Sequence, residues 1–267
     1  MKSQDKEQLR TTVRRFYGRS VKSRGGCGCS GSAGNIPDAK TSTPKLDSDA
    51  RFAYSPEEVK CFLGDQDAGA RAGNPLSAAS LKPGETVLDL GCGKGLDCLL
   101  AARVVGETGH VIGVDMTPEV LSLARRNLAR WNVKQVEFRL GEIEHLPVAD
   151  ASVGVVISNC VINLSPDKPR VFKEAFRVMK PGGRLAIEDI IATEPLPEEM
   201  RKDDTLYCNC IGGAVTIVEL KKMLKKAGFI KIMITPRMES RDLIRQWAPL
   251  PGADKYIVSA TLKAVKP

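Results

Sequence analysis

Apolar and polar positions along the chain alternate between two periods, which predicts strands separated by helices. Short apolar runs of strand length recur from residue 85 onward. The predicted strands are ETVLDLG, HVIGVDM, VEFRLGE, SVGVVISN, GGRLAIEDII, IKIMITPRM and YIVSATLKAV. Segments with helical spacing of apolar residues lie between most of them, for example at 96–105 and 168–179. Strands connected by such helices form right-handed crossovers, so we predict an α/β fold with a doubly wound, mainly parallel, seven-stranded sheet.

The first 75 residues have a different pattern. Leu9, Val13 and Phe16 recur at roughly helical spacing and predict a short amphipathic helix over residues 3–20. The Gly-, Ser- and Pro-rich stretch GGCGCSGSAGNIPDAKTSTP then predicts a linker. In SPEEV a capping Ser precedes Pro and two acids, which predicts a helix beginning near Ser55.

The net charge of the 267-residue chain is +8, and much of it lies near the N-terminus. A basic segment of this kind can contact nucleic acid or an anionic membrane. No aromatic residues interleave with the basic ones, as binding of single-stranded nucleic acid requires. We therefore favour a solvated helix face and expect neither a nucleic-acid nor a membrane partner. The sequence has no apolar run of roughly 18–20 residues and no signal-peptide core, which predicts a cytoplasmic protein.

Eight cysteines are many for a chain of this class, and they lie at positions 27, 29, 61, 92, 98, 160, 208 and 210. A disulfide scaffold is not expected in a long chain without an export signal. Cys92 and Cys98 flank a glycine turn and are expected to pack. The two C-x-C pairs, at 27–29 and 208–210, allow a four-cysteine zinc site, although zinc sites usually have C-x₂₋₄-C spacing.

The stretch VLDLGCGKG places Gly91, Gly93 and Gly95 directly after the first strand, where glycines let a ligand approach the backbone. Their G-x-G-x-G spacing differs from the dinucleotide fingerprint. Asp89 would repel a pyrophosphate but attract a cationic amino-acid ligand. Asp115 ends the second strand, where a carboxylate can accept hydrogen bonds from both hydroxyls of a ribose.

Two acids after the third strand, Glu142 and Glu144, are candidates for contact with an adenine edge. Together with the glycine turn, these residues resemble the class I methyltransferases that use S-adenosylmethionine (SAM). The resemblance covers about residues 84–190 and implies a Rossmann-like fold with an N-terminal helical cap and a C-terminal α+β extension. It implies a SAM site formed by Asp89, Gly91, Cys92, Gly93, Gly95, Asp115, Met116, Glu142, Ile143, Glu144 and Asn159.

Three cysteines lie where an acceptor could bind. Cys160 follows the fourth strand, at the carboxyl edge where open α/β sheets bind ligands, and Cys208 and Cys210 precede a glycine pair in LYCNCIGGAV. Methylation of oxygen or nitrogen often needs a His or carboxylate base, but His110 and His145 lie in no promising motif. These positions predict an acceptor that is itself nucleophilic and is held by thiols.

The segments SNCVINLSPDKPRVFKEAFRVMKPGG, CIGGA and YIVSATLKAVKP resemble the arsenite methyltransferase family. With GHVIGVDMTPE and FRLGEIEHLPV, the similarity runs from about Tyr54 to the end. It implies that Cys160 and Cys210 bind As(III), a soft and thiophilic element. Bound arsenic keeps a lone pair that can attack the methyl carbon without a general base. Thioredoxin or glutathione would then reduce the product. We expect a monomer.

One residue departs from the family pattern. The family commonly has G-C-G-N-P upstream of the cofactor turn, whereas this chain reads RAGNP, with Ala72 in place of the cysteine. A third arsenic ligand would then be Cys61, Cys208, or an exogenous thiol or hydroxide. We therefore expect inorganic arsenite to be used less well than methylated trivalent arsenicals. A quinone or lipid methyltransferase, and an arsenic-binding protein with little turnover, are the alternative functions.

The resemblance also suggests a division of the chain into three parts. Residues 1–75 form the N-terminal helix, linker and cap. Residues 76–195 form the SAM-binding methyltransferase domain, and residues 196–267 form an arsenic-binding cap segment with the final strands.

Overall fold

The computed structural model describes residues 3–22, Tyr54 and residues 72–267. Seven strands form one sheet in the order β3-β2-β1-β4-β5-β7-β6. The strands are β1 (Thr86–Leu90), β2 (His110–Asp115), β3 (Val136–Leu140), β4 (Val153–Asn159), β5 (Met179–Ala192), β6 (Ile230–Arg237) and β7 (Ile257–Val265). The expected helix near Ser55 and the linker lie outside the described residues. The seven predicted strands are confirmed.

The helices in the described part of the chain are α1 (Ser3–Lys22), α3 (Pro75–Ala79), α4 (Leu96–Val105), α5 (Pro118–Trp131), α6 (Lys168–Val178), α7 (Glu198–Lys202), α8 (Asp204–Cys208), α9 (Ile217–Ala227) and α10 (Ser240–Trp247), with short 3₁₀ turns η1 (Ile162–Leu164) and η2 (Ala253–Lys255). Within residues 3–22 and 72–267, every helix is too short or too polar to span a bilayer.

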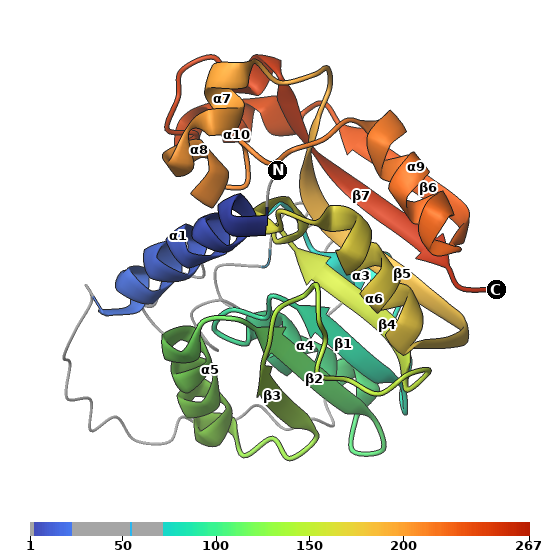
Figure 1. Ribbon diagram of the computed structural model, residues 1–267. Helices are drawn as coiled ribbons and strands as arrows, with labels where there is room; N and C mark the ends of the chain where they lie inside the picture. The colour runs from blue at the N-terminus through green and yellow to red at the C-terminus, as the bar shows by residue number, and fades with distance from the viewer. Residues whose placement is uncertain (1–2, 23–53, 55–71) are drawn as a thin grey trace.

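The sheet is mainly parallel, as predicted. Strands β3, β2, β1, β4 and β5 pair in parallel, whereas β7 runs antiparallel between β5 and β6. The C-terminal strands therefore do not form a separate layer but complete the same sheet (Figure 1). This order brings the end of β1 beside the end of β4, because these two strands are direct neighbours.

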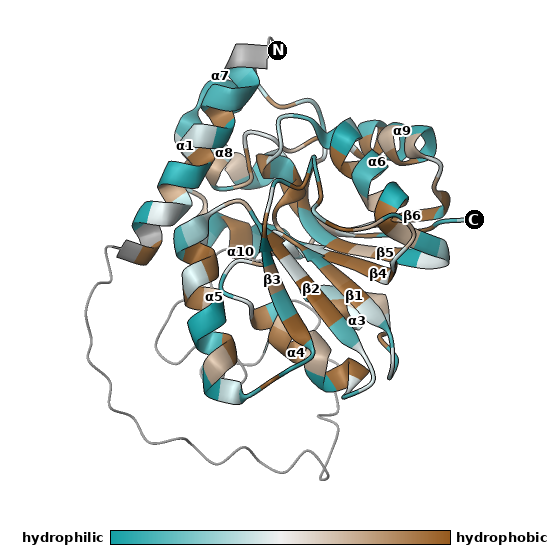
Figure 2. Cartoon of the chain, turned by 60° about the horizontal axis from the view of Figure 1, so that its bottom comes forward, coloured by the Kyte–Doolittle hydropathy of each residue, from teal (hydrophilic) through white to brown (hydrophobic). Residues whose placement is uncertain are grey.

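Helices cover both faces of the sheet, which makes it doubly wound. Successive strand residues point to opposite faces, so Leu88 packs with Phe172 of α6 and Leu224 of α9, whereas Val87 packs with residues of α3, α4 and α5. Figure 2 shows the central strands mostly brown and the surrounding helices largely teal on their outer surfaces. Burial of the apolar strand residues from both sides is the main source of stability for this arrangement.

Helix α1 lies across the molecule between α8 and α5 (Figure 1), and it contacts both. Val13 of this helix is fully buried, and Leu9 and Tyr17 are partly buried against the same cluster. The prediction for Phe16 is wrong, because this side chain is 42% exposed. Tyr17 takes its place: it lies four residues after Val13, packs against the same cluster and donates a hydrogen bond to the Cys208 carbonyl.

The basic residues of α1 were expected to form a solvated face, but three of them form ion pairs with acidic residues elsewhere in the chain. Lys6 pairs with Asp167 at 2.7 Å, and the Nη2 of Arg14 lies 3.3 Å from Glu142. The Nε of Arg10 lies 3.4 Å from Glu142. The positive charge of this helix is therefore partly neutralised by acids of the sheet domain.

Candidate functional site

The glycine turn after β1 leaves room for a ligand at one position. Gly91, Gly93 and Gly95 all have positive φ angles, which side chains disfavour. A Cβ on Gly91 would lie 2.5 Å from Val161, and one on Gly95 would lie 2.7 Å from the Phe138 ring. At Gly93 the same atom would meet nothing within 4 Å. The open side of the turn is therefore at Gly93, where a ligand can reach the backbone.

Asp115 lies at the end of β2, across from this turn. One of its oxygens accepts a hydrogen bond from the N–H of Gly93 at 3.1 Å, and the other accepts one from the N–H of Thr117 at 2.9 Å. Burial raises the pKa of Asp115, and these hydrogen bonds counteract the shift. The carboxylate is thus fixed beside the open side of the turn. Each oxygen has remaining lone pairs that can accept ligand hydroxyls.

Asp89 and the two neighbouring cysteines lie beneath the turn. The thiol of Cys98 donates to Asp89 Oδ2 at 3.3 Å, and burial raises the pKa of Asp89 to about 7. Cys92 is buried, and its thiol interacts with that of Cys98. The expectation that Cys92 and Cys98 pack is confirmed. Asp89 is 1% exposed, so a direct contact between its carboxylate and a ligand stays a prediction.

The two acids after β3 are paired with α1 and with the loop after β4. Arg10 and Arg14 contact Glu142, and the hydroxyl of Ser165 donates to Glu144 at 2.7 Å. Ile143 between them is buried in the core. Helix α1 therefore covers this end of the cofactor region, and the predicted adenine contacts would lie beneath it.

The structure brings Cys160 and Cys210 together from distant parts of the chain. Cys160 directly follows β4, and Cys210 lies in the turn after α8. The Cys210 thiol donates to the Cys160 carbonyl at 2.7 Å. The thiol of Cys160 and then burial are the largest causes of the raised pKa of Cys210. The two side chains are 4% and 0% exposed, so they form an enclosed pair of thiols.

Both cysteines have a backbone conformation that is unusual for residues with side chains. Their φ angles are +57° at Cys160 and +63° at Cys210. A non-glycine residue in this region costs of order 1–3 kcal/mol, and such residues cluster at ligand sites. Asp189 stabilises the loop beyond Cys160, because it accepts hydrogen bonds from Ile162 N–H at 2.9 Å and from the Asn163 amide at 3.0 Å.

The other cysteines are placed differently. Cys208 is buried in α8, and burial and then Asp204 raise its pKa to about 11. Cys61, Cys27 and Cys29 lie outside the described residues, so the proposed zinc site and third ligand stay untested there. All five described cysteines are free thiols. In the described part of the chain, no cluster of three or more His, Cys, Asp or Glu could hold a metal ion.

Ala72 lies in the same apolar cluster as Cys160 and Cys210, and it is 3% exposed. Its N–H donates to the Asn159 side chain at 3.0 Å, and the Asn159 amide donates to the Gly73 carbonyl at 2.8 Å. Arg237 donates to the Ala72 carbonyl at 2.7 Å and pairs with buried Glu188. Asn159, predicted at the cofactor, thus holds the backbone of residues 72–73 beside the thiols.

Sequence reasoning missed two residues near the thiols. The Tyr17 hydroxyl donates to the Cys208 carbonyl at 3.0 Å. Burial is the largest cause of the raised pKa of Tyr17, followed by charge on Cys210, Cys160 and Cys208. Lys168 is also buried, and it donates to the carbonyl of Ser165 at 3.1 Å. The spacing of Val13 and Tyr17 on one helix face was the available signal for Tyr17, whereas no local pattern marks Lys168.

The open turn at Gly93, the carboxylate of Asp115 and the flanking Met116 fit SAM. The turn leaves space for a ligand against its backbone, and the carboxylate has acceptors for ligand hydroxyls. That these contact the methionine part and the ribose of SAM stays a prediction. Because β1 and β4 are neighbours, this turn lies beside the loop that carries Cys160, and Gly91 lies against Val161 of that loop. The donor and a thiol-bound acceptor can therefore meet at one edge of the sheet.

Comparison with known proteins also identifies this chain as a methyltransferase. A family profile described as a methyltransferase domain matches residues 81–228. The chain is 46% identical to an arsenite methyltransferase of Halobacterium salinarum, over 98% of this chain and 68% of that protein. It is 45% identical to one of Aquipseudomonas alcaligenes over 58% of this chain, but it spans only 46% of that protein.

Among solved structures, an arsenic(III) S-adenosylmethionine methyltransferase of Chlamydomonas reinhardtii is 32% identical, with a TM-score of 0.60. The match covers 80% of this chain and 75% of that chain. The resemblance noted in the sequence segments around Cys160 and Cys210 is thereby confirmed over nearly the whole length. The chain belongs to the arsenite methyltransferase family of SAM-dependent methyltransferases.

Proposed function

We propose that this protein transfers methyl groups from SAM to trivalent arsenic held by Cys160 and Cys210. The observation that carries the proposal is the enclosed pair of contacting thiols at the carboxyl edge of the sheet, beside the glycine turn. Thiolate sulfur is a preferred ligand of soft elements such as arsenic. The substrates would be arsenite, methylarsenite or both.

The side chains divide the work between the two reactants. Gly93 and Asp115 would hold SAM, which when bound supplies a methyl group on a positively charged sulfur. Cys160 and Cys210 would orient the arsenic so that its lone pair points at this carbon. Because the lone pair is already nucleophilic, no base at the acceptor is needed. The protein then acts mainly by positioning the reactants, which can lower the activation free energy by roughly 7–11 kcal/mol.

Turnover requires a reductant, because arsenic loses two electrons when its lone pair forms the bond to carbon. Thioredoxin or glutathione would supply these electrons by thiol–disulfide chemistry. The free cysteines of the described chain are consistent with a cytoplasmic location, where thiols stay reduced. We further propose that the protein acts as a monomer, since both sets of site residues come from one chain.

The direct test is arsenic speciation after incubation with SAM and dithiothreitol, with arsenite and methylarsenite supplied in separate reactions. We expect methylated arsenic from at least methylarsenite, and none when SAM is omitted. Binding of arsenite without any methylated product would instead indicate an arsenic-binding protein with little turnover. Methylation of a quinone or lipid, with no arsenic product, would indicate the other alternative.

Ala72→Cys should improve the use of inorganic arsenite more than that of methylarsenite. Ala72 lies in the apolar cluster with both thiols, so a sulfur there would complete a three-thiol site. Arsenite has three bonds available for thiolates, whereas methylarsenite has two. We expect kcat/KM for arsenite to rise roughly tenfold, which corresponds to about 1.4 kcal/mol. Initial rates with each substrate measure the difference.

The matched control for this substitution is Ala72→Ser, because a serine side chain has nearly the same size as cysteine but lacks sulfur. It should leave the ratio of the two kcat/KM values unchanged. Equal improvement for the two substrates in Ala72→Cys would show that residue 72 does not bind arsenic.

A further inference from the structure

A buried ion pair lies under the backbone of residues 72–73. Arg237 at the end of β6 pairs with Glu188 of β5, and the two side chains are 12% and 3% exposed. The Nη2 of Arg237 also donates to the Ala72 carbonyl at 2.7 Å. Its Nη1 donates to Thr261 of β7 at 2.9 Å, and the Thr261 hydroxyl donates to Glu188 at 2.9 Å. Three adjacent strands therefore supply one polar network, and this network ends on residue 72.

Glu188 is also attached to the loop that carries Cys160. Its backbone carbonyl accepts a hydrogen bond from the Cys160 N–H at 2.8 Å. Glu188 lies opposite Asn159 in the parallel pairing of β4 and β5. The Asn159 side chain in turn holds the backbone of residues 72–73. This segment and Cys160 are thus connected twice, once through Asn159 and once through the ion pair.

Gly73 shows how closely the segment is held against the ion pair. A Cβ on this residue would lie 2.6 Å from the Glu188 carboxylate and closer still to the Arg237 guanidinium. The two charged groups are buried against each other, so neither can move aside without leaving its partner's charge buried and uncompensated. A residue without a side chain therefore lets the backbone approach the pair.

We propose that Arg237 and Glu188 are positioning residues for methylation, which hold residues 72–73 as a fixed wall of the acceptor site. The wall presents Ala72 to the apolar cluster that contains both thiols. The inference rests on the proposed function, because the acceptor is arsenic bound by these thiols. Small-molecule sites are usually pre-formed in this way, so we expect the wall to act on acceptor binding. It also gives a role to β6 and β7, which carry none of the predicted cofactor or thiol residues.

The first test is cysteine alkylation, and it uses neither arsenic nor SAM. Iodoacetamide is added to the folded protein, and peptide mass spectrometry gives the alkylation rate of each cysteine. Arg237→Lys keeps a charge beside Glu188 but lacks the planar fork that contacts three acceptors. Gly73→Ala displaces the segment while both charges remain. We expect alkylation of Cys160 and Cys210 to be about tenfold faster in both variants, because loss of a hydrogen bond to a charged group favours local opening.

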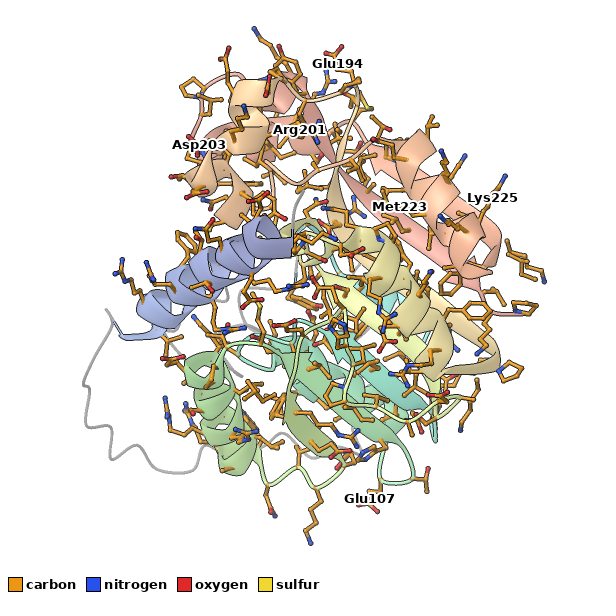
Figure 3. All side chains as sticks on the ribbon, viewed as in Figure 1. Glu107, Glu194, Arg201, Asp203, Met223 and Lys225 are labelled. Carbon is orange, nitrogen blue, oxygen red and sulfur yellow. The ribbon has the colours of Figure 1, made fainter. Side chains whose placement is uncertain are left out.

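Two controls separate this local effect from a general one. Cys92 and Cys98 are buried beneath the glycine turn, and their alkylation rates should not change. Arg184→Lys is the matched variant, because Arg184 also joins a carboxylate, that of Glu85, to two backbone carbonyls. Its contacts lie near the amino ends of β1 and β2, at the end of the sheet where Figure 3 labels Glu107. Unchanged alkylation of the thiol pair in the two test variants, or equal acceleration at Cys92 and Cys98, would overturn the proposal.

The second test separates positioning from a simple loss of folded protein. Arg237→Lys should raise the KM for methylarsenite roughly tenfold and leave kcat and the Kd for SAM unchanged. A smaller folded fraction would instead lower kcat at constant KM, and that result would refute a positioning role. Arg184→Lys should leave both constants unchanged. Absence of methylated product from the unmodified protein would refute the proposed function alone, because the alkylation test does not depend on methylation.

Discussion

Cys160→Ser is expected to reduce arsenic methylation by at least about 100-fold, because misplacement of a reacting group by about 1 Å already costs that much. The serine oxygen is a hard ligand and does not hold soft arsenic as sulfur does. Cys210→Ser should have a similar effect, since the two thiols contact each other and would share one arsenic atom. The measurements are initial rates of methylated product and the Kd for arsenite.

Cys208→Ser is the matched comparison, because Cys208 lies in the same segment but its thiol is affected by burial and Asp204 rather than by the pair. We expect this variant to retain most of its activity. A loss equal to that of Cys210→Ser would make Cys208 the third arsenic ligand. Full activity in both Cys160→Ser and Cys210→Ser would refute the proposal that these thiols hold the arsenic substrate. Thermal unfolding and SAM binding should be unchanged in all three variants.

Asp115→Ala should weaken SAM binding by roughly 10- to 100-fold, since hydrogen bonds to a charged group contribute about 1.5–3 kcal/mol each. The carboxylate lies at the end of β2 beside the open side of the glycine turn. It would accept hydrogen bonds from the ribose hydroxyls. Calorimetric titration with SAM measures the effect, and the arsenite Kd should not change.

The control for this variant is Glu137→Ala on the neighbouring strand β3. Glu137 pairs with His110 and Arg139 instead of facing the turn, so its loss should leave SAM binding unchanged. Asp115 also accepts a hydrogen bond from the Gly93 N–H, so its loss can disturb the turn. Asp115→Asn therefore provides a second measurement, because its amide oxygen keeps one acceptor. An unchanged SAM Kd in Asp115→Ala would refute the ribose assignment.

Much of the fold was predictable because its information is local. The strand at residues 86–90 and the helix at 96–105 follow from apolar runs and spacing that the final structure keeps. The glycine turn was predictable for the same reason, since Gly91, Gly93 and Gly95 adopt positive φ angles, which favour glycine. The face that α1 buries was predicted incorrectly at Phe16, because contact with a distant segment selected Tyr17 instead.

The sequence alone therefore determined the doubly wound class, the cofactor turn and the family, since each depends on short segments whose pattern is nearly independent of the rest. Only the tertiary structure decided that Cys160 and Cys210 contact each other and that Ala72 lies in their cluster. These residues come from different elements, and their proximity results from β1 and β4 pairing and from packing of α1 and α8 over the sheet edge. No pattern along one segment encodes such distances, because they depend on how the whole core packs.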